Sequence, residues 1–405
     1  MHVRQKDGDA GSPASLARGV GLLLRAASGL RYGELSIVAP NGATHLVAGP
    51  ESGPHASLIV KHARAAWRFA IGGAVGLAEA YMDGDWETPD LPALLTLAAI
   101  NDEALLDSYY GARWASTLRR LWHAGRANTR AGSRRNIAHH YDLGNAFYER
   151  WLDGSMTYSS AVFVRDDETL AEAQLNKYRR IAEKLEIAPH AHVLEIGCGW
   201  GGFARLIARE FGARVTAITV SRQQHDYARK RAQEDGLADR IDVRLVDYRD
   251  IDGRFDRIAS IEMFEAVGER YWPVFFAKLR DNLNDGGRAA LQVITIADRW
   301  FDSYRRSVDF IQRYIFPGGM LPSPTALRRL AEQAGLAVTR EEFFGPHYAR
   351  TLAEWQRRFQ DAWPDLIPMG FDRRFKRMWE YYLAYCEAGF RAGSIDVTQV
   401  ALVRR

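Results

Sequence analysis

A glycine-rich turn carries the residues whose types and spacing most directly indicate chemistry. An acidic residue, Glu195, stands two positions before Gly197, which is followed at alternate positions by Gly199 and Gly201. Glycines let the backbone turn sharply and leave room for a ligand to lie against it. The spacing differs from the G-x-G-x-x-G pattern of dinucleotide sites. It suits S-adenosylmethionine (SAM), whose amino-acid end carries an ammonium and a carboxylate but no phosphate. The alternative is a glycine turn in an unrelated α/β fold.

Polar side chains follow the ends of the next predicted strands as well. Thr219 and Gln224 could hold the ribose or the methionine end of SAM. Asp247 could accept a hydrogen bond from the adenine amino group, and Tyr248 could stack on the ring. A fourth strand end lies at 261–265. Because ligands bind at the carboxyl ends of parallel strands, polar groups at consecutive ends favour a cofactor site over isolated loop residues.

The elements that must position these groups form a regular alternation from residue 191 onwards. The apolar patterns predict strands at 191–196, 213–219, 241–246, 255–261 and 288–296, and helices at 201–211, 222–235 and 269–283. Such alternation predicts a parallel sheet with helices on both faces. A helix at 170–185 leads into it, and closing strands are predicted at 338–344 and 395–403.

One segment interrupts this alternation after the fifth strand. Residues 299–316 read as a helix rich in aromatic residues and arginine, ending at Pro317. An amphipathic surface helix would explain the pattern. Its position favours a lid over an apolar substrate.

The chain before residue 137 reads as a separate, smaller unit. The whole chain has 405 residues, a length that suggests two or three domains. We predict a small α+β domain over 1–122, a basic linker over 123–136 and a catalytic domain over 137–405. A basic run of this kind is usually a solvated hinge between domains, although its arginines could contact anionic lipid headgroups. Nucleic acid is disfavoured because no recognised binding module accompanies the run.

The composition indicates the compartment in which the protein works. The formal net charge is only +4, and the two cysteines, Cys198 and Cys386, imply neither a disulfide framework nor a cysteine-rich zinc site. No metal site is expected. A reducing, cytoplasmic setting fits, and the early apolar run is far too short to span a bilayer. A protein of this kind would meet a membrane only from its surface.

Taken together, the motifs resemble the cyclopropane-fatty-acyl-phospholipid synthase family, which includes the mycolic acid cyclopropane synthases. The likeness runs from about residue 62 to the C-terminus and is strongest after 137. The matching stretches are HHYDLGNAFYERWLDGSMTYSSAVF (139–163), VLEIGCGWGGFA (193–204), ITVSRQQHDYA (218–228), FDRIASIEMFEAVG (255–268), FIQRYIFPGGMLPS (310–323), PHYARTLAEW (346–355) and YYLAYCEAGFRAGSIDVTQ (381–399). Of these stretches, only the glycine turn is also common in other families, and the rest are particular to this one.

The resemblance implies a Rossmann-like SAM-dependent methyltransferase with a lid and a small N-terminal domain that assists lipid access and dimerisation. Its activity would carry the SAM methyl to a cis double bond of a phospholipid acyl chain, forming a cyclopropane through a carbocation. It implies a bilayer surface as partner, allows a homodimer, and places the protein in the cytoplasm at the inner face of the membrane. Alternatives are a methylene- or methyl-branched product, a small-molecule methyltransferase, and a lipid-binding homologue without turnover.

The resemblance also assigns residues to the reaction. A bound bicarbonate would take the proton, in a cradle that maps to Ser160, Ile261, Glu265, Gln292 and Tyr348. The aromatic candidates for stabilising the cation are Tyr158, Phe264, Tyr304, Tyr314 and Tyr348.

Three further assignments come from the same source. Tyr158 and Ser159 are assigned to the cofactor. Ser160 and Gln292 depart from the cysteine and histidine of many members, although both can still hydrogen-bond an oxyanion. Cys386 matches a family cysteine once considered catalytic; since the chemistry needs no sulfur nucleophile, a structural role is favoured for it.

Overall fold

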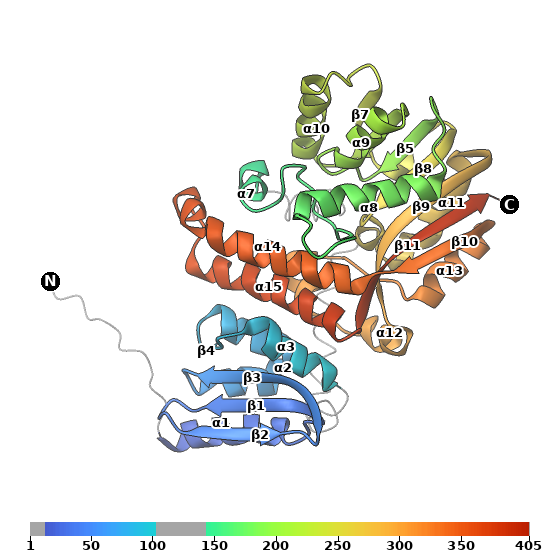
Figure 1. The fold of residues 1–405 in the computed structure, drawn as a ribbon. Coiled ribbons are helices and arrows are strands. Elements are labelled where there is room, and N and C mark those ends of the chain that lie inside the picture. Colours follow the sequence, from blue (N-terminus) through green and yellow to red (C-terminus); the bar gives the residue numbers. More distant parts are fainter. Residues whose placement is uncertain (1–12, 103–142, 405) are drawn as a thin grey trace. The chain divides into compact units, whose positions relative to one another are not determined.

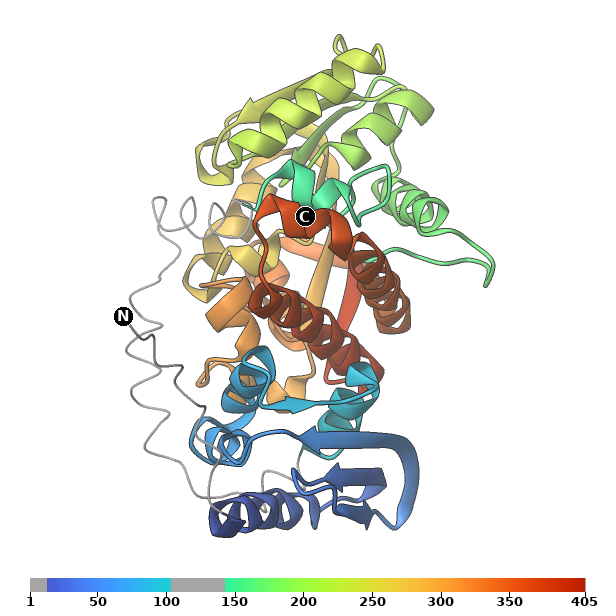
Figure 2. The ribbon, with the colours of Figure 1, turned by 90° about the vertical axis from the view of Figure 1, so that its left-hand side faces the viewer.

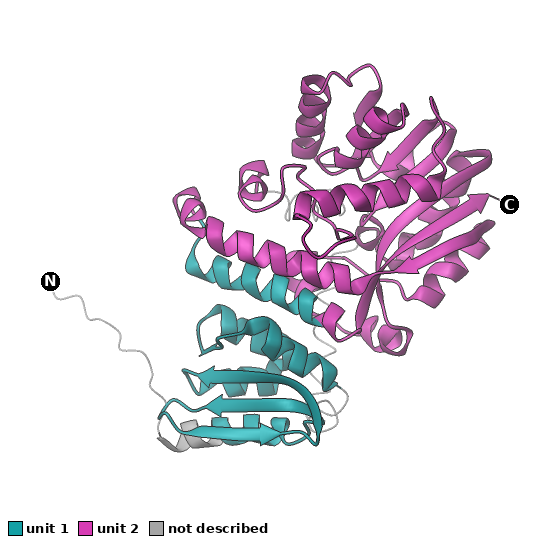
Figure 3. Ribbon diagram, in the orientation of Figure 1, with its two compact units in different colours: residues 1–119, 371–388 teal, residues 120–370, 389–405 magenta. Residues whose placement is uncertain are grey.

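The computed structural model describes residues 13–102 and 143–404, which form two compact units (Figures 1 and 3). Unit 1 comprises 1–119 and 371–388, and unit 2 comprises 120–370 and 389–405. The sequence placed 371–388 in the catalytic domain, whereas this segment packs with unit 1. The predicted linker over 123–136 lies outside the described residues.

Unit 1 contains a four-stranded sheet in the order β2-β1-β3-β4. Its strands are β1 (Tyr32–Val38), β2 (Thr44–Ala48), β3 (Glu51–Val60) and β4 (Trp86–Glu87). Strand-like alternation over 31–47 around Asn41 and Gly42 predicts a hairpin, which is confirmed because β1 and β2 pair antiparallel. Strand β3 pairs parallel with β1 and was not predicted, because Gly53 and Pro54 make its first half read as a loop.

The helices of unit 1 are α1 (Pro13–Ala27), α2 (Arg64–Met82), α3 (Leu91–Ile100) and α15 (Arg373–Arg391), whose last residues belong to unit 2. Helix α1 packs against β1 and β2 (Figures 1 and 2). The residue patterns at 62–69 and 73–81 predict two helices, whereas the structure has the single element α2 there. It is interrupted at Gly73, whose backbone is not helical.

Unit 2 is built on a seven-stranded sheet in the order β10-β11-β9-β8-β5-β6-β7 (Figure 1). The strands are β5 (His192–Ile196), β6 (Arg214–Thr219), β7 (Ile241–Leu245), β8 (Phe255–Ile261), β9 (Leu283–Ile296), β10 (Leu336–Phe343) and β11 (Ile395–Arg404). The five predicted strands are parallel. Strand β11 runs antiparallel to both of its neighbours, β9 and β10, so the sheet is mixed. Strand β9 begins at Leu283, whereas the sequence predicted its start at 288.

Helices cover both faces of this sheet, as the alternation predicts. One face packs against α8 (Leu170–Leu185), α9 (Gly202–Glu210) and α10 (Arg222–Glu234), and the other against α11 (Trp272–Asn282) and α13 (Pro324–Gln333). Successive side chains of a strand point to opposite faces. Val193 therefore lies in the first core and Leu194 in the second.

Shorter elements complete unit 2. They are α7 (Asn145–Glu149), η1 (Tyr248–Asp250), η2 (Phe264–Ala266), η3 (Glu269–Tyr271), α12 (Asp298–Tyr304), the π-helix η4 (Ile311–Ile315), α14 (Gly345–Leu366) and η5 (Ile367–Met369). The segment predicted as one helix over 299–316 is thus α12 and η4 with an irregular stretch between them. Within the described ranges, no helix is both long and apolar enough to cross a membrane.

The turn after β5 depends on Gly197. Its φ is +82°, and a Cβ at this position would lie 2.5 Å from Cγ of Met263. Gly212, by contrast, has φ +66° with no atom within 4 Å of the corresponding point. Substitutions at these two glycines therefore distinguish the cost of the backbone conformation from the cost of close packing.

We expect Gly212→Ala to cost about 1–2 kcal/mol, since it only forces an L-residue into a left-handed conformation. Gly197→Ala should cost a further 1–3 kcal/mol or so, because the methyl group also overlaps Met263. Thermal unfolding of both variants should show a clearly lower midpoint for Gly197→Ala. Equal midpoints would contradict the close packing of the turn.

Candidate active site

The candidate cofactor residues lie in unit 2, at or just beyond the carboxyl ends of β5, β6 and β7. The glycine turn follows β5, and Gly201 is the N-cap of α9. Beside Gly199, no atom lies within 4 Å of the point a Cβ would occupy, so a ligand can approach the backbone there.

Glu195 adds a polar group to this opening. Its Oε2 is buried without a hydrogen-bond partner among the described residues. Burial raises the pKa of Glu195 to about 8. An unpartnered buried carboxyl is costly, and the ammonium of a bound amino acid would satisfy it. The turn therefore fits the methionine end of SAM.

The end of β6 contributes a pair of buried side chains. Thr219 Oγ1 donates to Gln224 Oε1 at 2.9 Å. Ser221 caps α10 and fixes this turn, because its N–H donates to Thr219 Oγ1 at 3.1 Å. Thr219 and Gln224 therefore lie together, as a shared binding role requires.

The end of β7 differs in part from the prediction. Both Asp247 carboxylate oxygens accept hydrogen bonds from the Arg249 guanidinium, at 2.8 and 2.6 Å. A bond from adenine to Asp247 would have to share that carboxylate. Tyr248 packs edge-on against Phe275, with ring centres 5.5 Å apart, and its buried hydroxyl has no partner in the described structure. Both assignments to adenine remain predictions.

Tyr158 and Ser159 precede the sheet in sequence, and the Tyr158 cluster reaches the glycine turn because Tyr148 also contacts Trp200 at 5.1 Å between ring centres. The Tyr158 ring belongs to an aromatic cluster, 5.4 Å from Tyr148 and 5.1 Å from Trp355 between ring centres. Ser159 Oγ accepts a hydrogen bond from Nζ of Lys177 at 2.5 Å. Their predicted contact with the cofactor remains untested.

Lys177 is a site residue that the sequence reading missed. It is fully buried on α8, where desolvation lowers its pKa to about 8, opposed by the charges of Glu262, Asp153 and Glu195. It still carries a proton at neutral pH. Its spacing could have revealed it, because Lys177 falls on the same buried face of the helix as Leu170 and Ile181.

A second missed residue, Glu262, occupies the centre of the predicted bicarbonate cradle. Its Oε1 accepts from the backbone N–H of Ser160 at 2.8 Å and from Nε2 of Gln292 at 2.7 Å. Its Oε2 accepts from the hydroxyl of Tyr348 at 2.6 Å. Three predicted residues thus converge, and they converge on a side-chain carboxylate.

Bicarbonate does not fit this arrangement. The donors that would hold it already serve Glu262, and the Ser160 hydroxyl donates instead to the Ala161 carbonyl. Gln292 is fixed from its other side, where its Oε1 accepts from Gln399. Ile261 lies opposite Gln292 in the β8–β9 pairing and supports it through the backbone. The bound bicarbonate therefore stays a prediction, and the donors expected to hold it serve Glu262 in this structure.

Glu265 lies near this cluster and differs from Glu262. Its Oε1 accepts from the backbone N–H of Ile294 at 2.5 Å, whereas its buried Oε2 has no partner in the part of the chain described. Burial, and then the charge of Glu262, raise the pKa of Glu265 to about 8. Glu265 therefore keeps its proton at neutral pH, whereas Glu262 beside it is held by hydrogen-bond donors on both of its oxygens.

The aromatic candidates are not all equivalent. Phe264 is part of the core beneath the sheet, packed against Trp272 and Phe275, so it is a structural residue. Tyr348 stacks on Phe390 with ring centres 4.5 Å apart. Tyr304 accepts from Gln312 Nε2 at 3.3 Å, and Tyr314 lies beside Phe310. Roles for these three tyrosines remain predictions.

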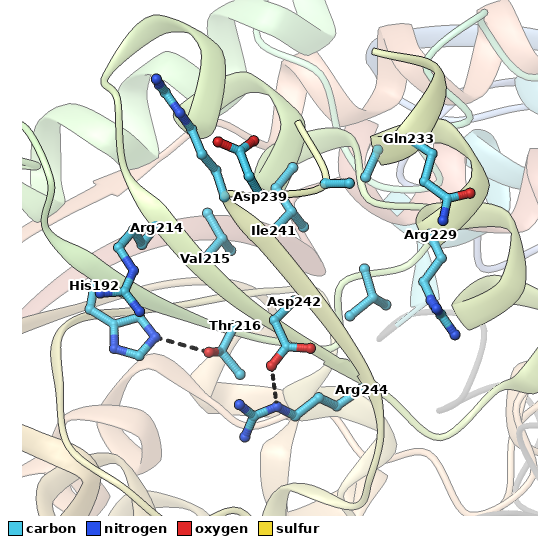
Figure 4. A pocket seen from close by; sticks show the side chains of 14 residues that line it. His192, Arg214, Val215, Thr216, Arg229, Gln233, Asp239, Ile241, Asp242 and Arg244 are labelled. Atoms are coloured by element: carbon cyan, nitrogen blue, oxygen red, sulfur yellow. Dashed lines mark hydrogen bonds and ion pairs between the residues drawn. The ribbon is translucent and has the colours of Figure 1, made fainter. Parts of the chain in front are cut away.

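Two further features are Cys386 and a polar pocket. Cys386 is a half-buried thiol on α15 in unit 1, and its assignment stays a prediction. A polar pocket is lined by residues of β5, β6, β7 and α10, among them His192, Arg214, Thr216 and Arg244 (Figure 4). None of the predicted site residues lines it, so it is not the site described above.

Comparison with known proteins agrees with the geometry. A family model described as mycolic acid cyclopropane synthetase matches residues 128–400. A tuberculostearic acid methyltransferase of Mycobacterium tuberculosis is 42% identical over 343 residues, 82% of this chain and 79% of that protein. The cyclopropane-fatty-acyl-phospholipid synthase of Escherichia coli K12 is 38% identical over 337 residues, 82% of this chain and 84% of that one.

Solved structures give the same result. The mycolic acid cyclopropane synthase CmaA1 complexed with SAH and CTAB is similar with a TM-score of 0.64 and 32% identity, covering 67% of this chain and 98% of that one. The chain therefore belongs to the mycolic acid cyclopropane synthetase family and is a SAM-dependent methyltransferase.

Proposed function

We propose that this protein transfers the methyl group of SAM to a cis double bond in an unsaturated phospholipid acyl chain and closes a cyclopropane ring. The observation that supports this most directly is the carboxylate of Glu262, held by three donors at the ends of β8 and β9. The turn that fits SAM follows the neighbouring strand β5. The methyl donor and a proton acceptor would therefore meet at one edge of the sheet.

The chemistry explains what the residues must do. SAM supplies an electrophilic methyl group, and an alkene is a weak nucleophile, so the double bond must be held close and in line. As the new carbon–carbon bond forms and the methyl–sulfur bond breaks, positive charge passes to the acyl chain. A carbon–hydrogen bond of the added methyl then breaks, its electron pair closes the ring, and a base takes the proton.

Aromatic rings next to the carboxylate cluster support the charged step. Trp355 lies between Tyr158 and Tyr348, with ring centres 5.1 and 6.1 Å away. Ring faces attract cations, most strongly where water is excluded. These rings could lower the energy of the charged acyl chain until the proton is lost.

A branched product is the second candidate. Loss of a proton from the chain instead of the added methyl would leave an alkene with a methyl or methylene branch. The departures at Ser160 and Gln292 favour considering it, as does the 42% identity to a tuberculostearic acid methyltransferase. Methyl transfer itself would be the same in both cases.

We also propose that the protein works at the inner surface of a bilayer. In unit 1, Trp67 and Ile71 are exposed by 48% and 58% and lie one turn apart on α2. Isolated exposed apolar residues are common, but a tryptophan with a neighbouring aliphatic residue suits a membrane–water interface. These two side chains could insert among lipid headgroups. Assembly as a homodimer also remains a proposal.

The function is tested with vesicles of cis-monounsaturated phospholipid and SAM carrying a labelled methyl group. Mass spectrometry of the released fatty acids should show a gain of one CH2 unit, and proton NMR should show upfield cyclopropane signals. Alkene signals with the same mass gain would support the branched product. Label found only in soluble acceptors, and none in lipid, would refute the proposal.

For the lipid surface, we expect the double variant Trp67→Ser, Ile71→Ser to bind vesicles about tenfold more weakly or worse, because two apolar side chains no longer leave water. Vesicle sedimentation measures this directly. Val164→Ser, which removes a 65% exposed side chain from unit 2, is the matched control. Equal loss in both variants, or none in the double variant, would count against α2 as the contact.

A further inference from the structure

We infer that Glu262 is the built-in base of this enzyme, a carboxylate of the chain that takes the proton directly and makes the reaction independent of bicarbonate. This inference rests on the proposed function and names the residue that completes its chemistry. It follows from the contacts, the backbone and the charges around one side chain.

The hydrogen bonds to Glu262 fill both acceptor positions of Oε1 but only one of the two on Oε2. An ionised carboxylate has about four acceptor positions. Two on Oε1 serve Ser160 and Gln292, and one on Oε2 serves Tyr348. Within the described residues, one acceptor position of Oε2 therefore remains for a proton from the substrate.

The backbone shows that this side chain is placed under constraint. Glu262 has φ +49°, a left-handed conformation that non-glycine residues adopt rarely. Its N–H donates to the carbonyl of Gln292 at 2.8 Å, which ties the strained residue to β9. Strain of this kind is characteristic of functional sites.

The charges around Glu262 keep it ready to accept a proton. Burial raises its pKa, while Lys177, Tyr348 and Gln292 act in the opposite direction. Lys177 is the nearby cation on α8, and Glu265 in η2 is the nearby acid, whose pKa is raised to about 8 so that it keeps its proton at neutral pH. A carboxylate base with a raised pKa is well matched to proton abstraction, because it holds the proton that it takes.

Glu262 is also next to the residues that receive the methyl donor. Its neighbour Met263 packs against Gly197, where an added Cβ would meet it at 2.5 Å. The strand before it, β8, pairs directly with β5. The proton released from the added methyl group has only to reach Oε2, which leaves a neutral Glu262 and a neutral product.

Two substitutions test this assignment. Glu262→Gly removes the carboxylate, suits the left-handed backbone and leaves the donors of Ser160, Gln292 and Tyr348 free to hold a small anion. Glu262→Gln keeps the shape but not the base. We expect turnover to fall at least about a hundredfold in both, a barrier increase of about 2.7 kcal/mol, with SAM affinity in calorimetry nearly unchanged.

Small anions should separate the two variants. Formate or bicarbonate should restore Glu262→Gly by tenfold or more, whereas Glu262→Gln should not respond because its amide fills the site. The wild-type rate should be the same in carbonate-free and bicarbonate-containing buffer. A wild-type rate that requires bicarbonate, or near-normal turnover in both variants without anion, would overturn the inference.

A binding measurement keeps the test independent of lipid turnover. NMR of 13C-labelled formate should show binding to Glu262→Gly and none to the wild type at the same site. The control is Glu186→Gly, which relieves another glutamate at φ +49° on an exposed helix end and should bind no formate and keep full activity. If the wild type fails on vesicles yet formate still binds only to Glu262→Gly, the proposed substrate is wrong while the anion site stands. Formate binding to neither protein would refute the site.

The pH profile gives a further prediction. The groups that face Glu262 are Lys177 and Tyr178 on α8, Glu265 on η2, and Tyr348 on α14. Since only the ionised carboxylate can accept a proton, kcat should fall as the pH drops through the raised pKa of Glu262. This acidic limb should move to lower pH in formate-rescued Glu262→Gly. An unchanged limb would show that another group controls it.

Discussion

The buried carboxylate of Glu262 is the interaction on which the catalytic unit depends. A carboxylate taken from water must be hydrogen-bonded and balanced in charge, or it takes up a proton. Here the balance draws on four parts of the fold: the N–H of Ser160, Gln292 on β9, Tyr348 on α14 and Lys177 on α8. Helices α8 and α14, strand β9 and the segment around Ser160 are thereby tied to one point.

Lys177 shows how the same requirement shapes the packing. A lysine among Leu170, Ile181 and Leu185 on a buried helix face would be a defect in an ordinary core. It is tolerated because three acidic side chains, Glu262, Asp153 and Glu195, lie close enough to favour its charge. The helix itself begins with a full capping box, which offsets part of that cost. The stability of α8 therefore depends on the charge balance in the site.

Much of this architecture could be predicted from the sequence, because strand and helix periods and glycine spacing are local signals. The five parallel strands and the turn at Gly197 follow from them. Glu262 could not be identified in this way. It lies within a strand end already assigned to function, but its role depends on Ser160 and Tyr348, which are 102 and 86 residues away. The resemblance located the cradle, and only the fold shows what fills it.

A carboxylate on the chain and a captured anion solve the same chemical problem at different cost. A captured anion must lose its freedom in solution each time it binds, whereas a side chain is already positioned. The side chain instead carries a fixed cost of about 1–3 kcal/mol for its left-handed backbone and a permanent charge that needs Lys177. Ser160 and Gln292 are consistent with this exchange. A backbone N–H and an amide suffice to hold a carboxylate that is already in place, so neither the cysteine nor the histidine of the usual pattern is needed.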